Sequence, residues 1–108
     1  MTELKDRNCT PLKAGTPALK EQEIIDLLEK LPQGWEVLEN RKIRKTFSFP
    51  NFKEGMAFAQ EIALLAEAED HHPDLCIQYT GVDVEFSTHS VGGLSENDFI
   101  MAAKIEAL

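Results

Sequence analysis

The sequence predicts one α+β domain, a four-stranded antiparallel sheet with helices packed on one face, in the order α-β-β-α-β-β-α. Three observations favour this class. The 108 residues, 43% of them hydrophobic, suffice for one domain with a modest core. Segments with the 3.6-residue period of a helix are separated by short segments that alternate like strands. The short segments come in pairs around turns, which favours two hairpins merging into one sheet.

The domain is expected at residues 16–108, after a flexible N-terminal arm at residues 1–15. The arm is polar, shows no periodicity and contains Pro11 and Gly15. Nothing in its own pattern indicates a role for it.

The first helix and the first hairpin follow the arm. An apolar stripe at i, i+3, i+4 and i+7 is formed by Ile24, Leu27, Leu28 and Leu31. Pro32 and Gly34 end this helix. Residues 35–38 and 43–49 then alternate like strands around a turn at residues 39–41, which predicts a β-hairpin.

A second, longer helix begins at Asn51, with Glu54 three residues later as its capping-box partner. One apolar stripe continues along it through Phe52, Met56, Ala59, Ile62, Ala63 and Ala66. Pro73 disfavours helical geometry at His72, so the helix must end at or before that residue.

The second hairpin is predicted from residues 75–79 and 82–88. Alternation places one set of side chains toward the core, namely Val82, Val84, Phe86 and Thr88. The same alternation places His89 on the opposite face, away from these core residues.

The final helix is expected from Ser95, with Asp98 as its capping partner, to Leu108. Its apolar residues surround more of the helix than one sheet can cover: Phe99, Ile100, Met101, Ala102, Ala103, Ile105 and Leu108. This surplus, together with the open sheet edges, predicts a homodimer or homotetramer.

Charge and cysteine content restrict the function classes. Nineteen acidic against eleven basic residues give a net charge of −8, which disfavours nucleic acid and anionic membranes as partners. Cys9 and Cys76 lie far apart and in no C-x-x-C pattern, as in a reduced cytoplasmic protein. No apolar run is long enough to span a bilayer, and the N-terminus lacks a secretory signal. We therefore expect a cytoplasmic location.

All three histidines lie in two short stretches, His71-His72 before Pro73 and His89 after Ser87-Thr88. A histidine side chain has an ordinary pKa of about 6.5, so it can both give and accept protons near neutrality. The clustering therefore predicts proton-transfer chemistry.

These residues resemble the pterin-4a-carbinolamine dehydratases over residues 17–108. The resemblance rests on fixed spacings in the family's order: Gly34-Trp35, Glu67-x-x-x-His71-His72-Pro73, Tyr79, Ser87-Thr88-His89 and Gly92-Gly93-Leu94-Ser95-x-x-Asp98. So many offsets make a chance match improbable.

The resemblance implies dehydration of 4a-hydroxytetrahydrobiopterin to quinonoid dihydropterin, in tetrahydrobiopterin recycling, with pterin as substrate and no cofactor or metal. It implies that His71, His72 and His89 line the pterin pocket. We expect His72 to be the principal acid/base, His71 its partner, and His89 to orient the substrate. Further residues are expected to bind substrate or support the histidines: Glu67, Asp70, Pro73, Ser87, Thr88 and Asp98.

Structural roles compete with several of these assignments. Glu67 lies on the predicted solvated face of its helix. A role as an ordinary surface residue and a role in orienting a histidine are equally expected for it. Asp98 stands where a capping carboxylate belongs, and we favour that role.

Two other function classes remain. One is a non-catalytic binding, scaffold or transcriptional-cofactor-like protein. The intact set of three histidines argues against this class, because a scaffold does not need three imidazoles at these spacings. The other is a metal site, which is disfavoured because adjacent histidines seldom reach one ion.

Overall fold

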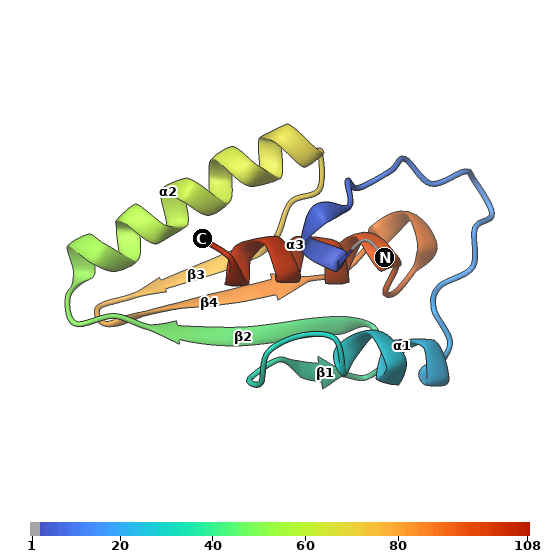
Figure 1. The fold of residues 1–108 in the computed structure, drawn as a ribbon, viewed down its shortest axis with the longest axis horizontal. Coiled ribbons are helices and arrows are strands. Elements are labelled where there is room, and N and C mark those ends of the chain that lie inside the picture. Colours follow the sequence, from blue (N-terminus) through green and yellow to red (C-terminus); the bar gives the residue numbers. More distant parts are fainter. Residues whose placement is uncertain (1–2) are drawn as a thin grey trace.

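Two β-hairpins join through their inner strands to form one four-stranded antiparallel sheet (Figure 1). The computed structural model describes residues 3–108. The strands, in sheet order β1-β2-β4-β3, are β1 (Glu36–Leu38), β2 (Lys42–Ser48), β4 (Gly81–Phe86) and β3 (Asp74–Gln78). The predicted hairpins and their merging are therefore confirmed.

The central strand pair carries the core. β2 and β4 pair in register from Ile43 opposite Phe86 to Ser48 opposite Gly81. Val82, Val84 and Phe86 alternate inward and are fully buried, as the two-residue period predicts.

The helices are α1 (Glu21–Leu28), α2 (Phe52–Glu69) and α3 (Glu96–Glu106), and they lie over one face of the sheet (Figure 1). The predicted cap of α2 is confirmed, because the Glu54 N–H donates to Asn51 Oδ1 at 2.9 Å. Asp70 ends α2 in the left-handed conformation, with φ of 53°. No helix within residues 3–108 has the length and apolar character needed to cross a membrane.

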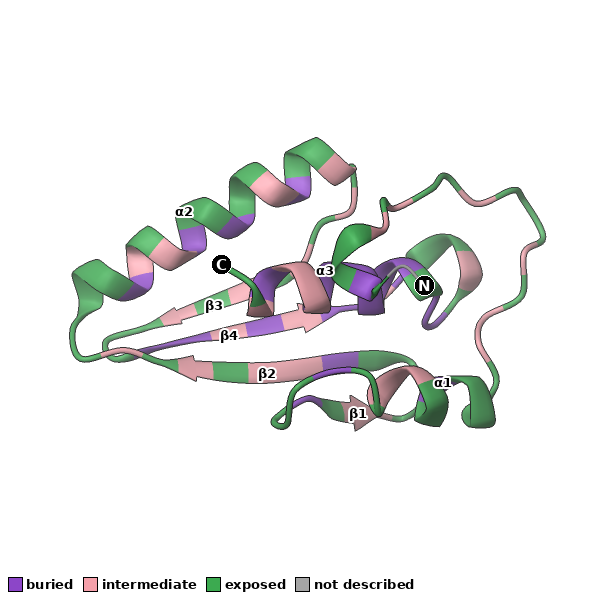
Figure 2. Cartoon of the chain, viewed as in Figure 1, coloured by how far each residue is buried: buried purple, intermediate pink, exposed green. Residues whose placement is uncertain are grey.

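The N-terminal segment packs against α3, which the sequence did not predict. It contains the short 3₁₀ turn η1 (Leu4–Asp6), which contacts α3, and Leu4 is only 5% exposed. Figure 2 shows α3 buried along most of its length beside this segment. η1 and α1 of the same chain contact α3, and its apolar surplus is covered except at Leu108, which is 53% exposed. This corrects our reason for expecting oligomers through this helix.

Candidate active site

The C-terminal end of α2, the end of β4 and the start of α3 meet at one end of the sheet (Figure 1). Each element ends there for a local reason. The left-handed Asp70 and the proline at position 73 turn the chain out of α2, and Ser95 begins α3 as its N-cap. The sequence-predicted site residues all lie around this junction.

His71 faces inward from this junction. Its Nε2 lies 2.6 Å from Oδ1 of Asp98, and its ring stacks on Phe86 with centroids 5.9 Å apart and planes 9° from parallel. The side chain is 13% exposed. Because a carboxylate only accepts, it selects the tautomer with the proton on Nε2 and leaves Nδ1 as the nitrogen that can accept a proton.

Asp98 is fully buried and uses both of its oxygens. Oδ2 accepts from the Ser95 N–H at 3.0 Å and from Thr88 Oγ1 at 2.8 Å, while Oδ1 faces His71. The Thr88 and Ser95 hydroxyls also hydrogen-bond each other at 2.8 Å. The predicted capping role is therefore present, and the same carboxylate holds a histidine.

His72 faces the other way, as neighbouring residues of extended chain do. Its Nε2 pairs with Oε2 of Glu67 on the last turn of α2, and the two side chains are 52% and 77% exposed. Glu67 was expected equally as a surface residue or as one that orients a histidine. In the structure it contacts His72 and is also exposed to solvent. Each of the adjacent histidines therefore has its own carboxylate, one buried and one exposed.

His89 stands apart from these pairs. β4 ends at Phe86, and Thr88 makes only an isolated bridge to Gly93 before the 3₁₀ turn η2 (His89–Val91) begins. The expected strand through residue 88 is therefore too long, and strand alternation does not set the direction of His89. Its side chain is exposed and makes no hydrogen bond within residues 3–108. Pro73 and Ser87 are half-buried at the same junction.

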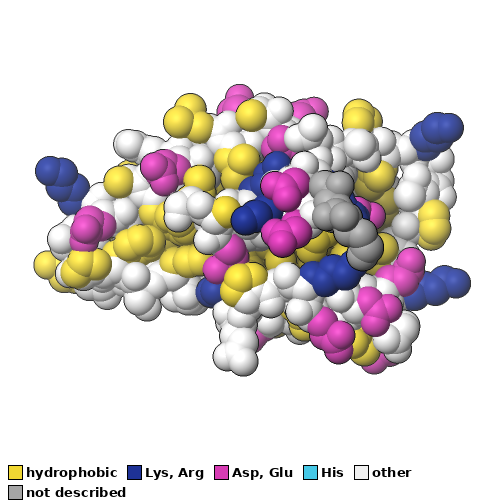
Figure 3. All heavy atoms as spheres, viewed as in Figure 1, with side chains coloured by type: hydrophobic (Ala, Val, Ile, Leu, Met, Phe, Trp, Pro, Cys, Tyr) yellow, Lys and Arg dark blue, Asp and Glu magenta, His cyan; other side chains and the backbone are white. Residues whose placement is uncertain are grey.

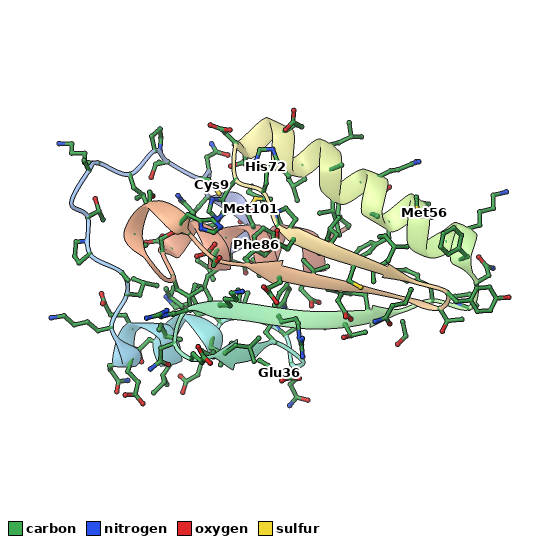
Figure 4. All side chains as sticks on the ribbon, turned by 180° about the vertical axis from the view of Figure 1, so that it is seen from behind. Cys9, Glu36, Met56, His72, Phe86 and Met101 are labelled. Atoms are coloured by element: carbon green, nitrogen blue, oxygen red, sulfur yellow. The ribbon has the colours of Figure 1, made fainter. Side chains whose placement is uncertain are left out.

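A cavity of about 310 Å³ opens at this junction. It is bordered by three predicted site residues, Asp70, His71 and Thr88, but not by His72 or His89. Its other lining residues were not predicted: Cys9, Thr10, Pro11, Leu12, Glu69, Ser90 and Asn97. Figure 4 shows Cys9 and His72 in the same region, beside the end of α2. The N-terminal residues could not be found from local patterns, because their partners lie 60 to 88 positions away.

The Cys9 thiol is part of this lining. Burial, and then the neighbouring carboxylate of Glu69, raise the pKa of Cys9 to about 12. The thiol is therefore protonated and unreactive at neutral pH.

Across the described part of the chain, no three histidine, cysteine or acidic side chains come together as a metal-binding group.

These features define a small α+β protein with two histidine–carboxylate pairs, of which one histidine, His71, borders a cavity. The chain belongs to the pterin 4 alpha carbinolamine dehydratase family, a class of hydro-lyases, because the family's sequence model matches residues 17–108.

Relatives of similar length agree with this assignment. A Nitrosomonas eutropha protein is 48% identical over 98% of this chain and 93% of its own length. A Rubrobacter xylanophilus protein is 41% identical over the full length of both chains. Both are provisionally named pterin-4-alpha-carbinolamine dehydratase. The crystal structure of a transcriptional coactivator/pterin dehydratase from Brucella melitensis superposes with a TM-score of 0.77 and 38% identity, covering 83% of this chain and 96% of that one.

Proposed function

We propose that this protein removes water from 4a-hydroxytetrahydrobiopterin, giving quinonoid dihydropterin, by histidine acid/base catalysis in tetrahydrobiopterin recycling. The observation that carries the proposal is the adjacent pair His71 and His72, each held by its own carboxylate. His71 borders the cavity, and the His72 side chain is exposed to solvent beside it in the chain. Family membership supplies the reaction class.

The reaction requires two proton transfers. A proton must reach the C4a hydroxyl so that it leaves as water, and the N5–H proton must be removed as the C4a–N5 double bond forms. The nitrogen lone pair supplies the electrons that expel the leaving group, so no cofactor is needed in this scheme. His72 acts as the principal acid/base and His71 as its partner, with the carboxylates of Glu67 and Asp98 fixing their tautomers.

The remaining predicted residues serve substrate binding in this proposal. His89 orients the pterin from the turn that follows β4. Asp70 and Thr88 border the cavity, whereas Pro73 and Ser87 shape the adjoining backbone. The acidic charge of the chain disfavours nucleic acid as a partner, and two free cysteines are expected of a reduced cytoplasmic protein.

The test follows loss of the 4a-hydroxy adduct's absorbance in a pterin-dependent hydroxylase reaction. Wild-type protein should accelerate that loss. His72→Ala should lower kcat by about 10² to 10⁴, the range of general acid–base catalysis, while pterin binding survives. His71→Ala and His89→Ala should also lose activity, the latter mainly through KM. Gln60→Ala, an exposed change on α2, is the control. Unchanged turnover in His72→Ala would remove this residue from the mechanism.

A second candidate is a binding role like that named for the Brucella melitensis protein, a transcriptional coactivator/pterin dehydratase. This candidate predicts a well-folded wild-type sample without dehydratase activity. Measurable turnover would leave catalysis as the function to be explained.

We further propose that the protein is a homodimer or homotetramer. Figure 3 shows an uncovered band of apolar side chains between α2 and β2. Phe47, Phe49 and Phe58 form an aromatic cluster in this part of the molecule and are only half-buried. An exposed apolar surface of this kind favours association. Sedimentation of the 12.1 kDa chain at micromolar concentration tests this, and a monomer mass would contradict it.

A further inference from the structure

We infer that residues Cys9–Leu12, here called the wall segment, form one side of the substrate cavity, and that Asn97 is the positioning residue that fastens them there. The inference rests on the proposed pterin site, because it concerns how the same cavity is completed. The family model begins at residue 17, so the wall segment lies outside the region that defines the family.

Asn97 holds the wall segment with both ends of its side-chain amide. The Thr10 N–H donates to Asn97 Oδ1 at 3.1 Å, and Asn97 Nδ2 donates to the Thr10 carbonyl at 2.8 Å. This is the pairing that a neighbouring strand would offer to an extended residue. Asn97 is only 7% exposed, whereas Thr10 is exposed, so the two hydrogen bonds are shielded from water on the α3 side.

A second attachment comes from the end of α2. The Cys9 N–H donates to Glu69 Oε1 at 2.7 Å, and Cys9 Sγ lies 3.7 Å from the Asn97 carbonyl oxygen. Upstream, buried Leu4 and the ion pair of Arg7 with Glu96 tie the chain to α3. The wall segment is therefore fixed at several points rather than laid loosely over the surface.

These attachments lie next to the catalytic groups in sequence. Asn97 adjoins Asp98, and Glu69 precedes His71 by two residues. The same two helix ends thus hold both the histidine–carboxylate pair and the wall segment, so their separation is set by the fold. Pro11 and Leu12 contribute apolar surface to the cavity, while Asp70, His71 and Thr88 contribute polar groups. A flat heterocycle with one apolar face and a polar edge matches this lining.

The experiment uses full-length protein carrying Cys76→Ser, which leaves Cys9 as its single thiol. The rate of Cys9 modification by a disulfide reagent at pH 8 reports whether the wall segment is seated. Asn97→Ala should raise that rate at least about tenfold, because the freed thiol returns toward its ordinary pKa of 9.0. The same variant should raise the KM for the carbinolamine about tenfold and change kcat by less than about threefold.

Thr10→Pro provides a second variant that leaves α3 unchanged. It removes the N–H that Asn97 accepts, so the same rise in thiol reactivity and KM is expected. Glu61→Gln, an exposed change on α2 away from the wall segment and its attachments, is the control, with both readouts near those of Cys76→Ser alone. Circular dichroism establishes that each variant is folded.

The outcomes separate the two proposals. A raised Cys9 reactivity with unchanged KM in both variants would overturn the wall role, and unchanged reactivity would overturn Asn97 as the fastening residue. Failure of the wild-type protein to dehydrate the carbinolamine would refute the proposed reaction instead. In that case the wall role is tested with the ligand 7,8-dihydrobiopterin. Slower modification of Cys9 in the presence of this ligand in the Cys76→Ser protein, with no such slowing after Asn97→Ala, would still support the wall role. Absence of slowing in the Cys76→Ser protein would contradict it.

Discussion

His71 Nε2 and Asp98 Oδ1 lie 2.6 Å apart, although 27 positions separate the two residues in the chain. The other oxygen of Asp98 accepts the Ser95 N–H that begins α3. One buried carboxylate therefore both starts a helix and orients a histidine, so stability and site geometry are coupled through it.

Asp98→Ala should lower the free energy of unfolding by about 2–4 kcal/mol, because the cap is lost and the Thr88 and His71 partners are left without an acceptor. Urea denaturation measures this. Asp83→Ala removes a carboxylate that accepts from Thr46 near the surface and should cost within about 1 kcal/mol. Equal losses in the two variants would contradict the dual role of Asp98.

Glu67→Gln should separate stability from activity. The pair of Glu67 with His72 is largely exposed, so the free energy of unfolding should change by less than about 1 kcal/mol. Since the amide no longer holds His72 as a carboxylate does, kcat should fall about tenfold. Glu61→Gln, an exposed change on α2, is the control for both measurements. Full activity in Glu67→Gln would show that this carboxylate does not assist His72.

Leu4→Ala should destabilise the protein by about 2 kcal/mol, near the lower end for buried leucines, because the short turn that carries it can relax toward the gap. Leu64→Ala, at a position that is 74% exposed on α2, should change stability by less than about 0.5 kcal/mol. Thermal or urea unfolding compares them. A neutral Leu4→Ala would mean that the N-terminal segment does not contribute to the core.

Cys9 should make stability decrease at alkaline pH. Burial first, then Glu69 and Asp98, raise its pKa from 9.0 to about 12 against the opposing charge of Lys104. Between these values the unfolded chain loses the thiol proton and the folded chain keeps it. The contribution of Cys9 to stability is therefore full below pH 9 and is lost as pH rises toward 12. The free energy of unfolding, measured in urea, should therefore fall more steeply over this pH range in the wild type than in Cys9→Ser. Parallel pH profiles would contradict the assignment.

Most of the fold was predictable because short-range rules act on it. The capping pairs Asn51 with Glu54 and Ser95 with Asp98 lie three residues apart, and the alternation of β4 follows from a two-residue period. The error at the end of β4 is instructive. The alternating residue pattern of the sequence continues through residue 88. The chain nevertheless leaves the sheet after Phe86, because Thr88 bonds to Gly93 instead of to β2.

The sequence by itself determined the order of helices and strands and the capping residues, since periodicity and hydrogen bonds between near neighbours decide these, and it located the histidines of the candidate site. Only the tertiary structure decided that Asp98 serves a cap and His71 together, that His72 turns to Glu67 in solvent, and that Cys9–Leu12 lines the cavity. These relationships join segments as many as 88 positions apart, and packing of α2 and α3 brings them together. Local patterns carry no record of such contacts.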